Sequence, residues 1–299
     1  MQNVYRSGVK LLRVASLFVC ANLCVLSSAA IRVDKDVVFA TVSGEELKLD
    51  LYWPENDTTS HAVVLMFHGG GWAAGDKSHH TVVGPLVAEA GYLAISANYR
   101  LSPKHKYPAG VQDCQAALKW VRANAAEYRG DARRLALMGE SAGGHLSSLL
   151  GLWDWTTSGP SQGASDDMKV RAVVNIYGPC DLSAFNGTQF CEDLATNFLG
   201  GTTETIPSLY REASPIHLLD QAGVVDKPGP AFLHVHGTAD ALVPVDQSRR
   251  FHARLKELGF DSTLVILEGA NHGWKPDSEE GKRAGKAAVE ILDRKLKAP

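Results

Sequence analysis

The hydrophobic residues of this chain gather in short continuous runs. Five of these runs have almost no polar alternation: residues 62–67 (AVVLMF), 92–98 (YLAISAN), 170–176 (VRAVVNI), 231–236 (AFLHVH) and 262–267 (STLVIL). Runs of this length and composition are typical of strands that are buried on both faces of a sheet.

Segments of a different periodicity separate these runs. Residues 46–53 alternate leucines with polar side chains and, together with residues 34–43, predict a half-exposed pair of strands. A further strand is predicted at 134–138. The spacing of apolar residues predicts five helices, over residues 82–90, 107–125, 142–150, 247–258 and 279–297.

Buried strands that alternate with helices indicate a mostly parallel sheet with helices on both faces. The predicted fold class is therefore α/β, with eight strands in a single domain over residues 31–299. Residues 177–225 interrupt the alternation with prolines and glycine pairs, and they predict a lid-like insertion between two strands. Ligands of such sheets bind at the carboxyl ends of the strands, so the residues that follow each strand are the first candidates for chemistry.

Residues 1–30 predict a secretory signal peptide. Arg6, Lys10 and Arg13 precede an apolar run over residues 14–26, and small residues follow that run. A basic segment, a short apolar run and small residues form, in this order, a cleaved export signal, and the run is short for a membrane span. We therefore expect a secreted or periplasmic protein without a stable membrane anchor.

Composition and charge narrow the class of protein. The 299 residues are 45% hydrophobic and 21% charged, as in ordinary globular chains, and a net charge of −3 without a basic stripe argues against a nucleic-acid partner. Beyond the predicted signal peptide the cysteines are Cys114, Cys180 and Cys191. Cys180 and Cys191 are close enough in sequence to close a small loop in an exported protein, but the sequence does not establish that disulfide.

A G-x-S-x-G motif lies between the strand at 134–138 and the helix at 142–150. It covers residues 139–143 (GESAG), and an elbow of this kind holds its serine in a strained turn with the hydroxyl exposed. Side chains in place of the two glycines would collide across the turn. The motif alone resembles any Gly/Ser-rich turn, but its place between a strand and a helix favours Ser141 as a nucleophile.

A run of glycines follows the strand at 62–67, in residues 68–72 (HGGGW). Successive glycines allow several backbone N–H groups to point at one anion, and the absence of a Walker-type Lys-Ser/Thr argues against a phosphate loop. We expect Gly70 and Gly71 to form an oxyanion hole together with Ala142, whose N–H lies at a helix N-terminus.

Two later strand ends supply an acid and a base. Asp240 follows the strand at 231–236, and His272 follows the strand at 262–267. His272 would take the proton of Ser141, because imidazole has a pKa of about 6.5, and Asp240 would orient the imidazole. Ser141, Asp240 and His272 are therefore the predicted catalytic residues.

Other chemistry-bearing residues have simpler interpretations. Asp246 is an alternative acid, but it is predicted at the start of a helix. His234 and His236 share a face of one strand, and packed histidines are commoner than metal ligands, so no metal or cofactor is expected. His79 and His80 are predicted to be solvated loop residues.

Two residues beside the motifs are candidates for substrate binding, Trp72 and Glu140. Glu140 precedes the nucleophile and either shapes the pocket or stabilises the elbow through a hydrogen bond, and Trp72 follows the oxyanion glycines. Asp113, in the helix at 107–125, is expected to be structural.

Six segments carry a resemblance to a known superfamily: HGGGW (68–72), GDK (75–77), NYRLSPKHKYPAG (98–110), GESAGGHL (139–146), HGTADALVPVDQS (236–248) and GANHGW (269–274). From about residue 34 onward the chain resembles the hormone-sensitive-lipase-like and BD-FAE-like esterases of the α/β-hydrolase superfamily. The resemblance implies that fold and a carboxylic-ester hydrolase without a cofactor, with Ser141, Asp240 and His272 as its triad. Asn98 departs from the family, which usually has aspartate there, and this puts a local structural contact in doubt.

Few residues precede His68, which leaves no room for the long N-terminal helical cap of the lipase-like branch. This favours the BD-FAE-like branch, whose relatives include acetylxylan and feruloyl esterases. We therefore expect a secreted serine esterase for small or polysaccharide esters. A prolyl-oligopeptidase-like peptidase is the alternative that residues 236–248 suggest, and a non-catalytic binding protein is the alternative from another class.

Overall fold

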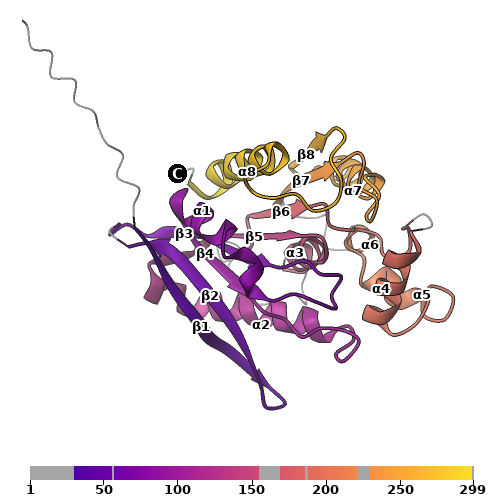
Figure 1. Ribbon diagram of the computed structural model, residues 1–299, viewed down its shortest axis with the longest axis horizontal. Helices are drawn as coiled ribbons and strands as arrows, with labels where there is room; N and C mark the ends of the chain where they lie inside the picture. The colour runs from indigo at the N-terminus through magenta and orange to yellow at the C-terminus, as the bar shows by residue number, and fades with distance from the viewer. Residues whose placement is uncertain (1–29, 56, 155–168, 186–187, 221–228, 298–299) are drawn as a thin grey trace, which may run out of the picture.

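The computed structural model describes residues 30–55, 57–154, 169–185, 188–220 and 229–297 (Figure 1). Residues 1–29, which hold all but the last residue of the predicted signal peptide, lie outside the described residues. Eight strands form one sheet in the order β1-β2-β4-β3-β5-β6-β7-β8. They are β1 (Ile31–Val42), β2 (Glu45–Pro54), β3 (His61–Phe67), β4 (Tyr92–Ala97), β5 (Gly130–Glu140), β6 (Ala172–Ile176), β7 (Ala231–Gly237) and β8 (Ser262–Leu267).

The predicted eight-stranded, mostly parallel sheet is confirmed. β1 pairs antiparallel with β2, and β2 pairs antiparallel with β4, whereas every later neighbour is parallel. The strand predicted at 134–138 begins earlier, at Gly130, because its first residues pair with the start of β3 across a register shift. These residues carry charged side chains, such as Asp131, which pairs with Arg134 at 3.1 Å. The beginning of the strand is therefore not part of an apolar run, and the sequence pattern does not predict it.

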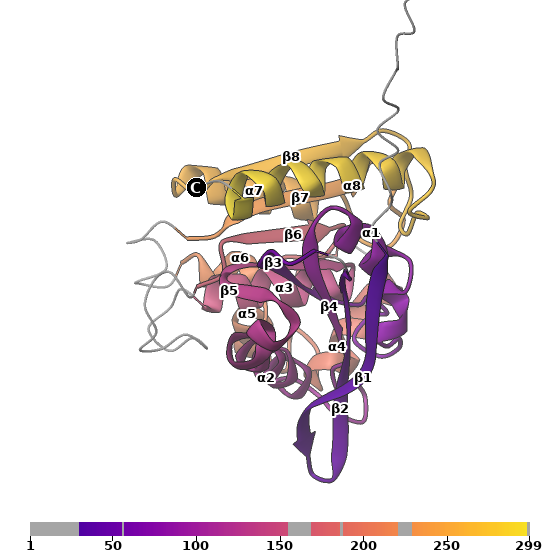
Figure 2. The same cartoon turned by 90° about the vertical axis from the view of Figure 1, so that its left-hand side faces the viewer.

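Helices cover both faces of the sheet (Figure 1, Figure 2). They are η1 (Lys77–His80), α1 (Val83–Glu89), α2 (Ala109–Asn124), η2 (Ala125–Tyr128), α3 (Ala142–Trp153), α4 (Gln189–Leu199), α5 (Pro207–Glu212), α6 (Pro215–Leu218), α7 (Asp246–Glu257), α8 (Glu279–Leu292) and η4 (Asp293–Lys297). Alternate side chains of a strand point to opposite faces, so β3 sends Val63 and Leu65 towards α2 and α3, and Val64 and Met66 towards α1 and α8.

The predicted insertion at 177–225 contains α4, α5 and α6, and part of it lies outside the described residues. α4 packs over the glycine run of residues 68–72, since a Cβ atom on Gly71 would lie 2.6 Å from Cδ1 of Leu194. Helix α4 therefore borders the carboxyl ends of the strands, where the candidate site lies. No helix in the described part of the chain is long and apolar enough to cross a membrane.

The disulfide considered between Cys180 and Cys191 is wrong. Both thiols are free and buried, as is that of Cys114. The Sγ atom of Cys191 donates to the carbonyl of Leu242 at 3.2 Å, whereas the Sγ atom of Cys180 lies 3.5 Å from the carbonyl of Gly178. The two cysteines pack against different loops, so their short sequence separation does not bring their sulfur atoms together.

Two polar contacts hold the loop after β4. Asn98 accepts a hydrogen bond from the backbone N–H of Lys77 at 2.7 Å, so its amide oxygen supplies the acceptor that an aspartate would offer. Asp113, predicted to be structural, is buried and binds the Arg100 guanidinium through two 2.8 Å contacts and the Arg100 N–H through a third. Helix α2 is thereby tied to the loop that follows β4.

This buried pair gives a prediction for stability. Asp113→Ala should lower the free energy of unfolding by about 3–5 kcal/mol, because it leaves the guanidinium of Arg100 without its partner. Glu45→Ala is the matched control, since Glu45 and Lys104 form a largely exposed pair worth less than about 1 kcal/mol. Urea unfolding of the two variants measures the difference, and equal midpoints would contradict the structural assignment of Asp113.

Candidate active site

The elbow at the end of β5 has the strained geometry that its sequence predicts. Ser141 lies between β5 and α3 with φ 53° and ψ −121°, a left-handed conformation that non-glycine residues rarely adopt. A Cβ atom on Gly143 would lie 1.9 Å from the carbonyl oxygen of Phe67, and one on Gly139 would lie 2.4 Å from the backbone of Gly143. The turn therefore has no room for side chains at either glycine.

Three predicted catalytic residues form one hydrogen-bonded row. Nε2 of His272 lies 3.0 Å from Oγ of Ser141, and Nδ1 of His272 lies 2.7 Å from Oδ2 of Asp240. An ionised carboxylate only accepts hydrogen bonds, so Nδ1 carries the proton, and Nε2 of the neutral ring is the acceptor for the serine hydroxyl. This is the arrangement in which an imidazole can remove a proton from the serine.

The carboxylate of Asp240 is fully buried and well supplied with donors. Its Oδ1 accepts the N–H groups of Leu242 at 2.9 Å and Val243 at 2.8 Å. Burial alone would raise the pKa of Asp240, but hydrogen bonds from His236 and His272 hold it well below its usual range. Asp240 therefore stays ionised opposite the imidazole, while the alternative acid, Asp246, is the first residue of α7.

His236 touches the same carboxylate, a role that sequence reasoning missed. Nε2 of this fully buried ring lies 2.9 Å from the carbonyl of Val243 and 3.2 Å from Oδ2 of Asp240, and its Nδ1 lies 2.7 Å from Oγ of Ser248. Both groups near Nε2 are acceptors, so Nε2 carries a proton. The described residues contain no group of three histidine, cysteine, aspartate or glutamate side chains that could hold a metal ion.

The predicted oxyanion glycines lie beside the nucleophile. A Cβ atom on Gly69 would be 3.3 Å from Cβ of Ser141, and Gly70 and Gly71 have φ values of 109° and 60°. Within the described residues no hydrogen bond uses the N–H groups of Gly70 and Gly71. The N–H of Ala142 is the first in α3 and has no acceptor within the helix. Three backbone donors therefore belong to the loop and helix end next to Ser141.

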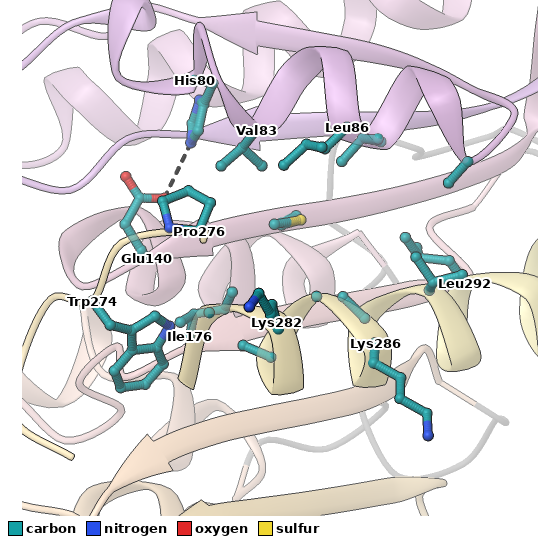
Figure 3. A pocket seen from close by; sticks show the side chains of 18 of the residues that line it. His80, Val83, Leu86, Glu140, Ile176, Trp274, Pro276, Lys282, Lys286 and Leu292 are labelled. Carbon is teal, nitrogen blue, oxygen red and sulfur yellow. Dashed lines mark hydrogen bonds and ion pairs between the residues drawn. The ribbon is translucent and has the colours of Figure 1, made fainter. Parts of the chain in front are cut away.

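Glu140 fastens the oxyanion loop to the elbow. Its Oε1 accepts the N–H of Gly69 at 2.9 Å, and its Oε2 lies 3.1 Å from Nε2 of His80 (Figure 3). Burial alone would raise the pKa of Glu140, but His80 and the Gly69 hydrogen bond hold it below its ordinary value. Two roles were considered for Glu140, shaping the pocket and stabilising the elbow through a hydrogen bond. The hydrogen bond to Gly69 corresponds to the second role.

The prediction that His80 is a solvated loop residue is wrong. Its ring is buried, and Nδ1 lies 2.7 Å from Oγ of Ser96 on β4. The short helix η1 turns His80 inward, while His79 stays exposed as predicted. The buried imidazole thus lies between Ser96 of β4 and the carboxylate of Glu140.

Trp72 is a core residue, and its predicted contact with substrate stays a prediction. The indole is 3% exposed and stacks on Phe198 of α4 with ring centres 4.8 Å apart. Its Nε1 donates to Nδ1 of His145 at 3.1 Å, while Nε2 of His145 donates to the carbonyl of Ala213 at 2.7 Å. The tryptophan therefore anchors α4 over the glycine loop.

Aromatic rings pack around the imidazole of His272. Tyr177, with a φ of 43°, packs against the ring of His272 at 4.6 Å and against Trp274 at the same distance. Neither contact follows from the sequence pattern, although GANHGW places Trp274 two residues after His272.

The sequence of this chain matches a known protein family. Residues 49–255, more than half of the chain, match the BD-FAE family. The chain belongs to the BD-FAE family. It is 35% identical to esterase LipC of Mycobacterium tuberculosis over 254 residues, which are 81% of this chain and 60% of the relative. Carboxylesterase NlhH of the same organism is 40% identical over 116 residues, 38% of this chain and 36% of the relative. This BD-FAE chain thus spans about three fifths or less of these curated relatives.

Solved structures agree with the family. A truncated carbohydrate esterase from gut microbiota matches this BD-FAE chain with a TM-score of 0.73 and 26% identity, over 89% of this chain and 98% of that one. Esterase 2 of Thermogutta terrifontis, in its form phosphoramylated by tabun, matches with a TM-score of 0.69 and 26% identity, over 88% and 94%. The α/β-hydrolase fold that the resemblance implied is therefore confirmed.

The contacts of His236 predict a change in the reactivity of Ser141. His236→Leu removes the donor beside Asp240, and we expect Ser141 to react with a fluorophosphonate probe up to about 100-fold more slowly, as for a displacement of about 1 Å. His236→Gln, whose amide N–H can replace Nε2–H, is the control and should stay within about threefold of the wild type. Melting temperatures of the same variants show whether a slower reaction comes from misfolding or from displacement of Asp240. Equal labelling of all three proteins would exclude any role for His236.

The buried His145 predicts a loss of stability in acid. Burial lowers the pKa of His145 to about 4, whereas this histidine in the unfolded chain should titrate near its ordinary pKa of 6.5. The unfolded state therefore binds the proton first. The free energy of unfolding falls as pH drops from about 6.5 towards 4, by about 3 kcal/mol for this ring. Urea midpoints at pH 7.5 and pH 5 measure the loss. His145→Gln, which can still accept from Trp72 and donate to Ala213, should lose less; an identical loss would contradict the assignment.

Proposed function

We propose that this protein hydrolyses carboxylic esters through an acyl-enzyme on Ser141. The observation that carries the proposal is the hydrogen-bonded row of Ser141, His272 and Asp240. It lies next to a loop in which the N–H groups of Gly70 and Gly71 make no hydrogen bond within the described residues. Nucleophile, base and orienting acid are then in place, and no other group needs to be supplied.

The reaction follows from this arrangement. Oγ of Ser141 attacks the ester carbonyl while Nε2 of His272 takes its proton, and the N–H groups of Gly70, Gly71 and Ala142 bind the oxyanion that forms. The C–O bond to the alcohol then breaks, and the imidazolium returns its proton to the leaving alkoxide. Water repeats the sequence on the acyl-enzyme and releases the carboxylic acid. Throughout, Asp240 stabilises the imidazolium through Nδ1.

Acylated polysaccharides are the substrate class that we propose, with acetyl or feruloyl groups as the acyl part. Support comes from the BD-FAE family match and from structural neighbours whose titles name a carbohydrate esterase and a bifunctional GH43-CE protein of Bacteroides eggerthii. The curated relatives are named as esterases, which favours an ester over the peptide bond of the peptidase alternative. The export signal predicted in residues 1–30 is consistent with a substrate outside the cytoplasm, and we propose secretion on that basis.

Two exposed apolar side chains are better candidates for substrate contact than Trp72. Leu242, which is 36% exposed, follows Asp240 by two residues, and Phe190 on α4 is 59% exposed. The thiol of Cys191 donates to the Leu242 carbonyl, so the beginning of α4 adjoins the loop of the acid. We propose that Phe190 and Leu242 contact the substrate at the rim of the site.

Ser141→Ala tests the reaction. Removal of the nucleophile should lower kcat for p-nitrophenyl acetate by at least about 10,000-fold, because the remaining groups only bind and polarise the ester. Ser147→Ala in the same helix is the matched control, since that buried hydroxyl has no partner within the described residues, and it should retain activity. A panel of acetylated xylan, feruloylated sugars and peptide amides then defines the substrate. Activity that survives Ser141→Ala would overturn the proposal, and faster cleavage of amides would favour a peptidase.

A further inference from the structure

A cavity of about 550 Å³ lies between α1 and α8, and Glu140, Tyr177 and Trp274 border it (Figure 3). None of Ser141, Asp240 and His272 lines it. Its floor is formed by Met138 of β5 and Ile176 of β6. It lies on the face of the sheet opposite α2 and α3, and one of its ends adjoins the site described above, where Tyr177 packs against His272.

The cavity is a consequence of helix spacing on this face. A helix with its side chains is about 10–12 Å wide and strands are about 4.8 Å apart, so one helix covers about two strands. α1 lies on β2 and β4, and α8 lies on β6 and β7. β3 and β5 are neighbours in the sheet and lie between the two helices, and η4 contacts β5.

Short side chains keep this space open. α8 presents Gly281, Ala284, Gly285 and Ala288 to the cavity, and a Cβ atom on Gly285 would meet nothing within 4 Å. On the facing side of the cavity, Leu86 of α1 is 48% exposed. Apolar surface of this kind costs about 25 cal/mol per Å² while it faces water, so an apolar occupant would gain that free energy.

Two polar features of the cavity, the Glu140–His80 pair and Lys282, differ in whether their charges are already paired. At one end Glu140 and His80 bind each other, and Glu140 also holds Gly69, so this end offers no unpaired charge. On α8, Figure 3 shows Lys282 beside the cavity and Lys286 directed away from it. The ammonium of Lys282 pairs at 3.0 Å with Glu279, but both side chains are exposed, by 62% and 82%. Such a surface pair is weak and can be exchanged for a ligand anion.

We propose that this groove binds an alkyl carboxylate of the fatty-acid class. The carboxylate lies at Lys282, and the chain runs over Met138 between α1 and α8 towards Leu292. An apolar trough with one exchangeable cation at its side selects a single negative charge on an unbranched apolar body. Binding itself does not depend on the proposed ester hydrolysis. Only a link between groove binding and ester hydrolysis rests on the proposed function. Hydrolysis releases carboxylates, and Glu140, at the end of the groove, directly precedes Ser141.

Titration calorimetry on full-length Ser141→Ala tests the groove without turnover, so an inactive wild type would leave this result unaffected. The probes are dodecanoate, dodecanol, dodecyltrimethylammonium and acetate, each below its aggregation concentration. We expect one dodecanoate per chain, at least tenfold weaker binding of the cationic amphiphile, and no binding of acetate. Absence of saturable dodecanoate binding, or equal affinity for the cation, would overturn the proposal.

Three further substitutions in that background locate the ligand. Gly285→Leu fills the trough and should weaken dodecanoate at least tenfold, while Lys282→Met should weaken dodecanoate at least fivefold and leave dodecanol unchanged. Lys256→Met, an exposed lysine of α7, is the matched control and should change neither. Dodecanoate binding that survives Gly285→Leu would place the ligand elsewhere. A dimer that Gly285→Leu converts to a monomer would assign the groove to a second copy instead. Either result overturns the proposal.

Discussion

The contact between the elbow and the end of β3 is the constraint on which the rest of the site depends. Gly143 lies so close to Phe67 that a Cβ atom would lie 1.9 Å from its carbonyl oxygen. That approach sets the first turn of α3 directly against the loop of residues 68–72. Ser141 and the oxyanion glycines come from segments about seventy residues apart, yet this backbone contact fixes their separation. Strain at Ser141 is then sustained by the parallel pairing of β5 with β3 and β6.

Two carboxylates, Asp240 (buried) and Glu140 (partly buried), secure the loops around that contact in the same way. Asp240 accepts two N–H groups of its own loop on one oxygen and faces His272 and His236 with the other. Glu140 accepts Gly69 on one oxygen and faces His80 with the other. Burial of a carboxylate is unfavourable unless hydrogen bonds and a nearby positive charge compensate it, so each acid is stable only while its loops stay in place. Loop position and charge are therefore coupled.

The sequence predicts those parts of the molecule that depend on local pattern. Apolar runs mark the buried strands, and parallel topology carries Ser141, Asp240 and His272 to one edge without any knowledge of their contacts. Side-chain burial outside the strands depends on packing between distant segments. There the prediction for His80 was wrong, and the burial of Trp72 was not predicted. Trp72 finds its acceptor on His145, 73 residues later, and His80 meets Glu140, 60 residues later. Charged residues at the beginning of β5 obscured that strand for the related reason that ion pairs, not apolar burial, hold them.

β5 connects the elbow at Ser141 with the groove between α1 and α8. Its last residue, Glu140, ends the groove between α1 and α8 and immediately precedes Ser141, while Met138 forms the groove floor. On this face η4 contacts β5, while α1 and α8 lie on other strands and leave Met138 at the groove. An occupant of the groove would therefore touch the side chain that holds Gly69, and through it the oxyanion loop. Because that loop is tied to the elbow by backbone contact, a small displacement of Glu140 would be transmitted to the reacting groups rather than absorbed by a flexible segment.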